Sequence, residues 1–257
     1  MVRLTVLGCS GSVPGPGTAA SGYLVEAGDV RLVLDLGNGT FARLQEICDS
    51  FDVSALLFSH LHPDHCADFT ALITMRRFFP NPPFDPIERR LAVYAPAEAP
   101  NRFAAMHAPS AEELRDTDLS DVFDFHALVA GTFHIGDVEV TVAPMAHICE
   151  AYGFRVRHQG RSLVYSGDTA RCAELDRLAE GADVLLTEAS WVNQGSYPGN
   201  LHMTGKDAGQ LARDAGVRRL LLTHILPWTD KDAVFADASE TFPGTVTVVE
   251  QGDVFQI

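Results

Sequence analysis

One short stretch, His60-Leu61-His62-Pro63-Asp64-His65, constrains this chain more than any other. It places three histidines and a carboxylate within six residues, one residue after the apolar run 55–58, which predicts a buried strand. Neutral imidazoles and an ionised Asp are ligands that divalent zinc, manganese and iron prefer. A lone histidine is usually a core or surface residue, but this dense and ordered group predicts a metal site where a strand ends.

Further residues of the same chemical kind follow other apolar runs that predict strands. They are His147, Asp168, Glu188 and His224. Because the ends of strands in α/β proteins gather at one edge of a sheet, we expect these side chains to meet the histidine cluster. Seven residues of this set suit two metal ions, and one carboxylate between two metals can bridge them at roughly 3.5–4 Å.

The rest of the chain predicts alternating short strands and helices without a repeat, a linker or a low-complexity tract, so we expect a single domain over residues 1–257. The turn 35–38 is predicted to cap a helix, and Asp35 either supports a ligand histidine or simply serves the turn. Helical spacing or composition predicts helices at 40–48, 67–79 and 204–215 and short helices within 97–121.

The charge balance limits the partners of this chain. It has 34 acidic and 19 basic residues, a formal net charge of -15, which disfavours general nucleic-acid or anionic-membrane affinity. A small anionic substrate stays compatible, because bound cations reverse the local field. No apolar run approaches the ~20 residues of a membrane-spanning helix, and residues 1–8 predict a strand and a turn, not a signal peptide.

The five cysteines are odd in number and have no Cys-x-x-Cys spacing, so we expect free thiols in a reducing cytoplasm. Cys66 and Cys149 lie near candidate ligands in the sequence. We interpret both as small buried apolar residues.

Taken together, the histidine loop, the distant His147, the Gly167-Asp168-Thr169 motif and the final His224 resemble the metallo-β-lactamase superfamily. The resemblance covers the whole chain in the expected order and implies an α/β fold, a four-layered αββα sandwich. It also implies two divalent metal ions, zinc or manganese, with iron as another choice. The implied ligands are His60, His62 and His147 for one metal, Asp64, His65 and His224 for the other, and Asp168 as the bridge.

Within that superfamily, Glu188-Ala189-Ser190 and His202-Met203-Thr204 resemble motifs of the ribonuclease Z-like branch. The resemblance implies that Glu188 orients His202, which stabilises or protonates the leaving group, while Asp64 orients the attacking water or accepts its proton. The alternative is structural: a histidine at a helix start beside a glutamate at a strand end.

Ribonuclease Z carries a long basic arm that binds tRNA, between the positions of His147 and Asp168. Here only twenty residues separate the two, and one predicted hairpin uses nearly all of them. The same core without that arm resembles bacterial cyclic-nucleotide phosphodiesterases of the atypical class II type, through the segments 7–12, 188–191 and 224–229. This implies a phosphodiesterase for a small substrate such as cyclic AMP, with no stable nucleic-acid binding and no membrane. Relatives of this kind are often homodimers.

Three other functions are compatible with the sequence. The first is a ribonuclease Z-like RNA endonuclease, and the second is a thioesterase or lactonase on the same fold. The third is a non-catalytic metal-binding regulatory module, although all seven ligand positions are filled here.

Some residues keep two interpretations each. Trp191 and Tyr197 either stack on a nucleobase or pack as core or lid residues. Arg76 and Arg77 either contact phosphate or lie on a solvated helix face. Asp68 stands where the superfamily often has glycine, and it either adjusts the choice of metal or caps the helix that follows it.

Overall fold

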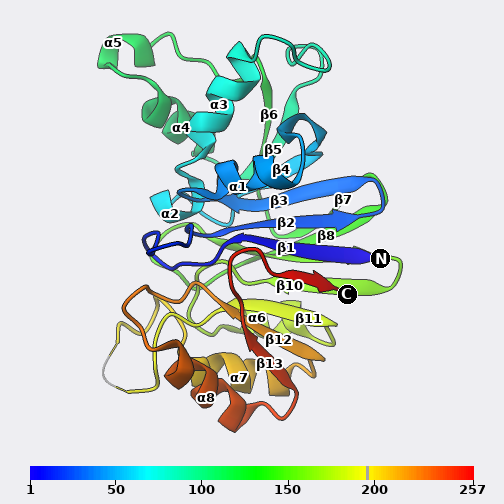
Figure 1. The fold of residues 1–257 in the computed structure, drawn as a ribbon, viewed down its shortest axis with the longest axis vertical. Coiled ribbons are helices and arrows are strands. Elements are labelled where there is room, and N and C mark those ends of the chain that lie inside the picture. Colours follow the sequence, from blue (N-terminus) through cyan, green and yellow to red (C-terminus); the bar gives the residue numbers. More distant parts are fainter. Residues whose placement is uncertain (195–196) are drawn as a thin grey trace.

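The computed structural model describes residues 1–194 and 197–257. Its strands form two seven-stranded sheets that pack face to face, with helices on both outer faces (Figure 1). The strand order is β14-β1-β2-β3-β4-β5-β6 in the first sheet and β13-β12-β11-β10-β9-β8-β7 in the second. The predicted four-layered αββα sandwich is confirmed.

The first sheet contains β1 (Val2–Gly8), β2 (Gly22–Ala27), β3 (Val30–Leu36), β4 (Ala55–Leu57), β5 (Leu91–Ala95), β6 (Phe123–Ala127) and β14 (Val254–Gln256). The second contains β7 (Gly131–Ile135), β8 (Val138–Pro144), β9 (Tyr152–His158), β10 (Arg161–Tyr165), β11 (Val184–Glu188), β12 (Arg219–Thr223) and β13 (Thr245–Val248). The helices over the first sheet are α1 (Thr40–Ile47), α2 (Pro63–Cys66), α3 (Phe69–Phe78) and α4 (Ala99–His107), with the 3-10 turn Ser50–Asp52, and the short helix α5 (Ala111–Leu114), which has no buried residue, lies at the far end of the molecule (Figure 1). Those over the second sheet are α6 (Ala173–Ala179), α7 (Gly205–Asp214) and α8 (Lys231–Thr241).

Three apolar layers hold the sandwich together. The middle layer lies between the two sheets and includes Leu57 of β4 and Leu186 of β11, both fully buried. Phe69 of α3 packs in the layer over the first sheet, and Leu211 of α7 in the layer over the second. Each such side chain stabilises the fold by roughly 1.5–3 kcal/mol when it is buried. The three layers therefore hold the sheets firmly together, and the packed sheets fix the positions of the loops at their edge.

The direction of the strands brings the chemical residues to one edge. Strand β4 runs parallel to β3, and β10, β11 and β12 are mutually parallel neighbours. Strands β8 and β10 are each antiparallel to β9 and therefore run the same way. In Figure 1, α2 and the loops after β1 and β12 lie on the left of the molecule, whereas both termini lie on the right. The functional site is therefore expected at this edge, where β4, β8, β10, β11 and β12 end.

The helix predicted at 67–79 is observed, but it is shorter and a separate helical turn precedes it. Residues Phe69–Phe78 form α3, but a separate helical turn, α2, already starts at Pro63 inside the histidine motif. Proline is favoured at the first helical position because its φ is preset for a helix and its missing N–H is not needed there. As a result, Asp64 and His65 project from a helical turn, while His60 and His62 precede it.

Helix α8 was not anticipated from the sequence. Its apolar side chains lie mostly in the consecutive run 233–236, which goes around the helix, and Val234 and Ala238 are its buried residues, so its periodic pattern is weak. The available signal was the N-cap, because the Asp230 carboxylate accepts hydrogen bonds from the backbone N–H groups of Asp232 and Ala233 at 3.0 and 3.2 Å.

Asp68 caps a helix, but not the one that follows it in the chain. Its Oδ2 accepts a hydrogen bond from the backbone N–H of Phe41, in the first turn of α1, at 2.9 Å. The N-cap of α1 is Gly39, at a φ of 88°, and glycine has no side chain that can serve this role. The expected turn 35–38 contributes one acceptor, because the Gly37 carbonyl accepts a hydrogen bond from the backbone N–H of Thr40 at 3.1 Å, and Asp68 supplies the side-chain cap.

In the ranges 1–194 and 197–257, no helix has both the length and the apolar character needed to cross a bilayer. Of the two cysteines predicted to be buried, Cys66 is buried and Cys149 is exposed. Cys149 lies on the loop between β8 and β9 next to the exposed Ile148, so the prediction for this thiol is wrong.

Candidate metal centre and active site

The seven predicted ligand residues meet at the sheet edge. They form two groups in which the ligand atoms lie within 4.8 Å of one another, and Asp168 belongs to both. The first group is His60, His62, His147 and Asp168, and the second is Asp64, His65, His224 and Asp168. Each group combines residues that follow strands of both sheets, so the site closes only when the two sheets pack.

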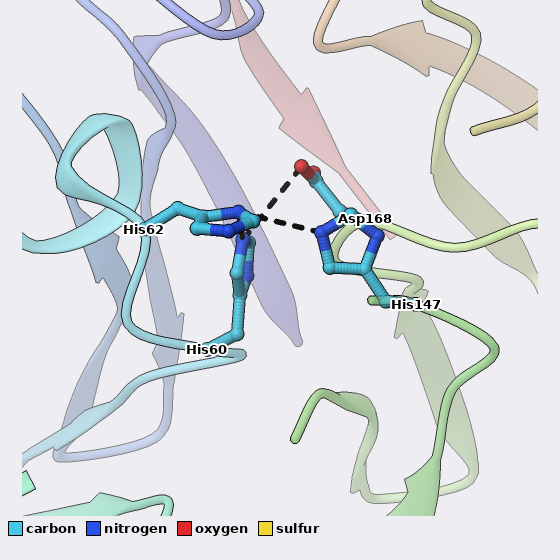
Figure 2. Close-up of side chains that lie close together, drawn as sticks. All are labelled: His60, His62, His147 and Asp168. Carbon is cyan, nitrogen blue, oxygen red and sulfur yellow. Dashed lines mark hydrogen bonds and ion pairs between the residues drawn. The ribbon is translucent and has the colours of Figure 1, made fainter. Parts of the chain in front are cut away.

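In the first group, three imidazole nitrogens and a carboxylate face a common point (Figure 2). His62 Nδ1 lies 2.9 Å from His60 Nε2 and 3.3 Å from His147 Nε2. Asp168 Oδ2 lies 3.7 Å from His60 Nε2. Several nitrogen lone pairs and an anionic oxygen directed at one point are the arrangement that a transition-metal cation satisfies.

The second group is more deeply buried. His65 Nε2 lies 3.2 Å from Asp168 Oδ1 and 3.4 Å from Asp64 Oδ2, and His224 Nε2 lies 3.2 Å from Asp168 Oδ2. Among the described residues, Asp64 Oδ2, His65 Nε2, Asp168 Oδ1 and His224 Nε2 are buried without a hydrogen-bond partner. Since a buried polar atom without a partner is strongly disfavoured, these four inward-facing atoms fit a bound cation well.

The other nitrogen of four histidines has a partner outside the site. His60 Nδ1 lies 3.0 Å from Ser59 Oγ, and His65 Nδ1 lies 2.8 Å from Asp35 Oδ2. His147 Nδ1 lies 2.9 Å from the carbonyl oxygen of Leu201, and His224 Nδ1 lies 2.9 Å from Ser21 Oγ. A proton held on Nδ1 by such an acceptor leaves the Nε2 lone pair free for a metal. Asp35 therefore supports the ligand histidine His65, which was one of the two roles expected for it. No sequence signal indicated that Ser21 or the carbonyl of Leu201 would bond to a ligand histidine.

The pKa shifts of four histidines and of Asp168 suit bound cations, whereas His65 is held in its protonated form by the carboxylates around it and would lose that proton to a metal. Burial lowers the pKa of four histidines, which keeps them in the neutral, ligating form at neutral pH: His60, His62, His147 and His224. Burial opposes the charge on Asp168, but His224 and His65 outweigh it and hold the pKa of that carboxyl well below its usual range. Burial would also lower the pKa of His65, yet the carboxylates of Asp168, Asp64 and Asp35 raise it well above the ordinary value.

His202 lies beside these groups and is held by Glu188, at the end of β11. The fully buried Glu188 carboxylate accepts hydrogen bonds from His202 Nδ1 at 2.9 Å, Thr169 N at 2.6 Å, Met203 N at 3.1 Å and Ser190 Oγ at 3.0 Å. These four donors make Glu188 a hydrogen-bonding anchor. Burial alone would lower the pKa of His202, but the Glu188 carboxylate raises it above the ordinary value. His202 Nε2 is the nitrogen left for a substrate.

The two aromatic residues of the following loop contact each other. The rings of Trp191 and Tyr197 stack at 4.3 Å with an interplanar angle of 10°, and the ring of His202 meets Trp191 edge-on at 5.2 Å. One face of Trp191 is therefore covered by Tyr197. This geometry favours the packing interpretation of the pair, with Trp191 supporting His202.

The two arginines at the end of α3 bind other parts of the protein. Arg76 is buried, its guanidinium lies 5.2 Å from the ring centroid of Phe51, and it donates to the carbonyl of Arg89 at 2.7 Å. Arg77 forms an ion pair with Asp121 at 2.9 Å. The interpretation of Arg76 as part of a solvated face is therefore wrong, because aromatic and backbone groups of neighbouring segments enclose it.

Comparisons with known proteins agree with this architecture. A family model described as a beta-lactamase superfamily domain matches residues 31–225. An uncharacterized protein of Mycobacterium leprae is 45% identical over 259 residues, which cover 100% of this chain and 89% of that protein. A ribonuclease Z of Mycobacterium sp. strain KMS is 31% identical over 249 residues, which cover 88% of this chain and 85% of that protein.

Solved structures extend the comparison to the fold. The crystal structure of the metallo-beta-lactamase fold protein YhfI from Bacillus subtilis matches with a TM-score of 0.85 at 24% identity and covers 100% of both chains. The family match spans most of the chain and includes the histidine motif, Asp168 and His224. The chain therefore belongs to the metallo-β-lactamase superfamily of metal-dependent hydrolases.

Proposed function

We propose that this protein is a dinuclear-metal-dependent phosphodiesterase for a small substrate, with a 3′,5′-cyclic nucleotide such as cyclic AMP as the best candidate. One observation carries the proposal: two ligand groups share Asp168, and His202 Nδ1 lies 3.9 Å from Asp168 Oδ2. A shared carboxylate suits two cations roughly 3.5–4 Å apart, the arrangement that serves phosphoryl transfer. A neighbouring imidazole suits protonation of the leaving oxygen.

The proposed cations are two zinc or manganese ions, with iron as another choice, because imidazole and carboxylate ligands serve all three. The first would be held by His60, His62 and His147, the second by Asp64, His65 and His224, and both by Asp168. When bound, they would supply Lewis acidity toward the phosphoryl oxygens and acidify a water molecule for attack on phosphorus.

The chain's own side chains would move the two protons. Asp64 would orient the attacking water or accept its proton, and it is ionised for either role because ion pairing with His65 outweighs burial and keeps the pKa of this carboxyl below its usual range. His202 would donate a proton from Nε2 to the departing 3′-oxygen. Glu188 would hold Nδ1 of the same ring, which fixes its direction and favours its protonated form. Water and a cyclic phosphodiester thus yield a phosphomonoester and a free hydroxyl group.

The connection between His147 and Asp168 supports a small substrate. The twenty residues between them form β9, β10 and their short loops. The net charge of -15 adds no general affinity for a polyanion. The 31% identity to a ribonuclease Z keeps an RNA endonuclease as the second candidate function.

The cysteines support a proposed cytoplasmic location. All five are free thiols in the structure, and a protein that leaves its thiols unpaired suits a reducing compartment.

A substrate panel tests the proposal and separates it from its alternatives. Purified protein supplied with Mn²⁺ or Zn²⁺ is expected to hydrolyse bis(p-nitrophenyl) phosphate and cyclic AMP. Turnover of a thioester or lactone without either phosphodiester would overturn the phosphodiester assignment. Cleavage of a precursor tRNA at its 3′ trailer without cyclic-nucleotide hydrolysis would favour the endonuclease.

Trp228 is expected to bind the base of the substrate. It lies four residues after His224, is 71% exposed and belongs to a turn that Thr229 Oγ1 fastens to the Ser190 carbonyl at 3.2 Å. Because stacking contributes roughly 1–3 kcal/mol per base, Trp228→Ala is expected to raise KM for cyclic AMP about tenfold with little change in kcat. Steady-state kinetics measure the effect. Phe235→Ala, which removes a partly exposed aromatic from α8, is the matched control, and an equal rise in KM there would refute a specific role for Trp228.

A further inference from the structure

Two buried tyrosines cross between the sheets beneath the metal centre. Tyr23 belongs to β2 of the first sheet and Tyr165 to β10 of the second, and their ring centroids lie 5.0 Å apart. Neither side chain is exposed to solvent by more than 2%. The hydroxyl of each ring bonds to a residue of the opposite sheet: Tyr165 to Asp35 Oδ2 at 2.7 Å, and Tyr23 to Thr223 Oγ1 at 2.6 Å.

The two hydroxyls differ in what lies beyond their partners. Asp35 Oδ2 also accepts a hydrogen bond from His65 Nδ1 at 2.8 Å, so Tyr165 is joined to a predicted ligand through one carboxylate. Thr223 is uncharged, and the neighbouring His224 has its Nδ1 bonded to Ser21 Oγ instead. Tyr165 therefore has a path of charge-assisted hydrogen bonds to the metal centre, whereas both side-chain partners of Tyr23, Thr223 and Ser21, are uncharged hydroxyl groups.

Asp35 depends on its donors to keep its position. It is 1% exposed, and its backbone φ of 56° lies in the left-handed region, which non-glycine residues adopt infrequently and Asp more readily than most. Its Oδ2 accepts hydrogen bonds from Ser59 Oγ at 2.7 Å, from His65 and from Tyr165. Tyr165 is the donor among these that comes from the second sheet, and water cannot replace it at so buried an atom.

The segment that contains Tyr165 also contacts His65 at its second ring nitrogen. Asp168, three residues after Tyr165, places Oδ1 at 3.2 Å from His65 Nε2. The imidazole thus lies between two carboxylates, Asp35 at Nδ1 and Asp168 at Nε2. Burial, reinforced by Asp35, raises the pKa of Tyr165 well above its ordinary value, so its hydroxyl remains a donor.

We propose that Tyr165 is a positioning residue for the metal centre: through Asp35 it orients His65 and strengthens the binding of the second cation. Tyr23, its crossed neighbour, supports the packing of the sheets without acting on metal affinity. The inference rests on the proposed two-metal site. It adds a residue of the second sheet that acts on a ligand of the first.

The test compares Tyr165→Phe with Tyr23→Phe, which each delete one buried hydroxyl from the same ring pair. Zn²⁺ affinity is measured by competition with a chromophoric chelator, and the melting temperature of the metal-free protein is measured in parallel. Both variants are expected to lower the melting temperature, and Tyr165→Phe more than Tyr23→Phe, because its hydroxyl bonds to a carboxylate. Only Tyr165→Phe is expected to weaken the binding of one of the two zinc ions. The expected loss of affinity is about tenfold, the lower end of the range for removing a hydrogen-bond partner of a metal ligand.

A second variant keeps the test decisive if Tyr165→Phe fails to fold. Asp35→Asn is expected to weaken the same zinc equivalent, and the double variant is expected to be no weaker than Asp35→Asn alone, because both changes act through one path. Wild-type zinc affinity in Tyr165→Phe or in Asp35→Asn, or equal losses in Tyr165→Phe and Tyr23→Phe, would overturn the role of Tyr165. Fewer than one zinc per wild-type chain would instead contradict the metal centre itself.

Discussion

His202→Ala is expected to lower kcat for cyclic AMP by about 10²–10⁴-fold, the usual range for removal of a general acid, while the bound metal stays at the wild-type amount. The reason is the position of His202: Glu188 holds its Nδ1 at 2.9 Å and raises its pKa, and His202 is not one of the seven predicted ligands. Steady-state kinetics and elemental analysis of the same preparation measure the two quantities.

The leaving group supplies the sharpest control for this prediction. p-Nitrophenolate is a stable anion that needs no proton, so His202→Ala is expected to retain far more of its activity on bis(p-nitrophenyl) phosphate than on cyclic AMP. His134→Ala, which removes an exposed histidine from β7, is expected to leave both activities unchanged. Equal losses on both substrates would argue against proton donation, and a loss of metal would show that His202 is a ligand.

Asp168→Asn is expected to abolish the binding of at least one metal and to lower kcat by more than roughly 10³-fold, beyond the loss of a single electrostatic contact. The cause is that Asp168 alone belongs to both ligand groups, with Oδ2 at 3.7 Å from His60 Nε2 and Oδ1 at 3.2 Å from His65 Nε2. A neutral amide cannot balance the charge of two cations. Zinc titration with elemental analysis gives the stoichiometry, and kinetics on cyclic AMP give the rate.

The matched control for Asp168→Asn is Asp137→Asn. Asp137 also pairs with a histidine, since its Oδ2 lies 2.9 Å from His158 Nε2, but it is outside both ligand groups and largely exposed. This variant is expected to keep the wild-type metal content and rate. If Asp168→Asn still binds two metals with wild-type affinity, the role of Asp168 as the ligand shared by both metals is refuted.

The local pattern of the chain predicted the histidine cluster and the strand ends around it. The apolar run before His60 became β4, and the buried runs before Glu188 and His224 became β11 and β12. The fully buried parallel strands lack alternation and read as continuous apolar segments, which is why they were recognisable. Where the pattern was weak, as in α8, or where a helix began at Pro63 within a motif, the prediction missed the element or its start.

What the sequence determined by itself was the chemistry that is available: the ligand types, their order and the strand ends that carry them, because these follow from composition and from local periodicity. Only the tertiary structure decided which partner each side chain meets. Asp68 caps α1 rather than the helix after it, Arg76 lies buried against Phe51, and Tyr165 reaches Asp35 across the sheets. Such contacts depend on how two sheets pack face to face, and local sequence periodicity carries no information about the atom that lies opposite a given side chain.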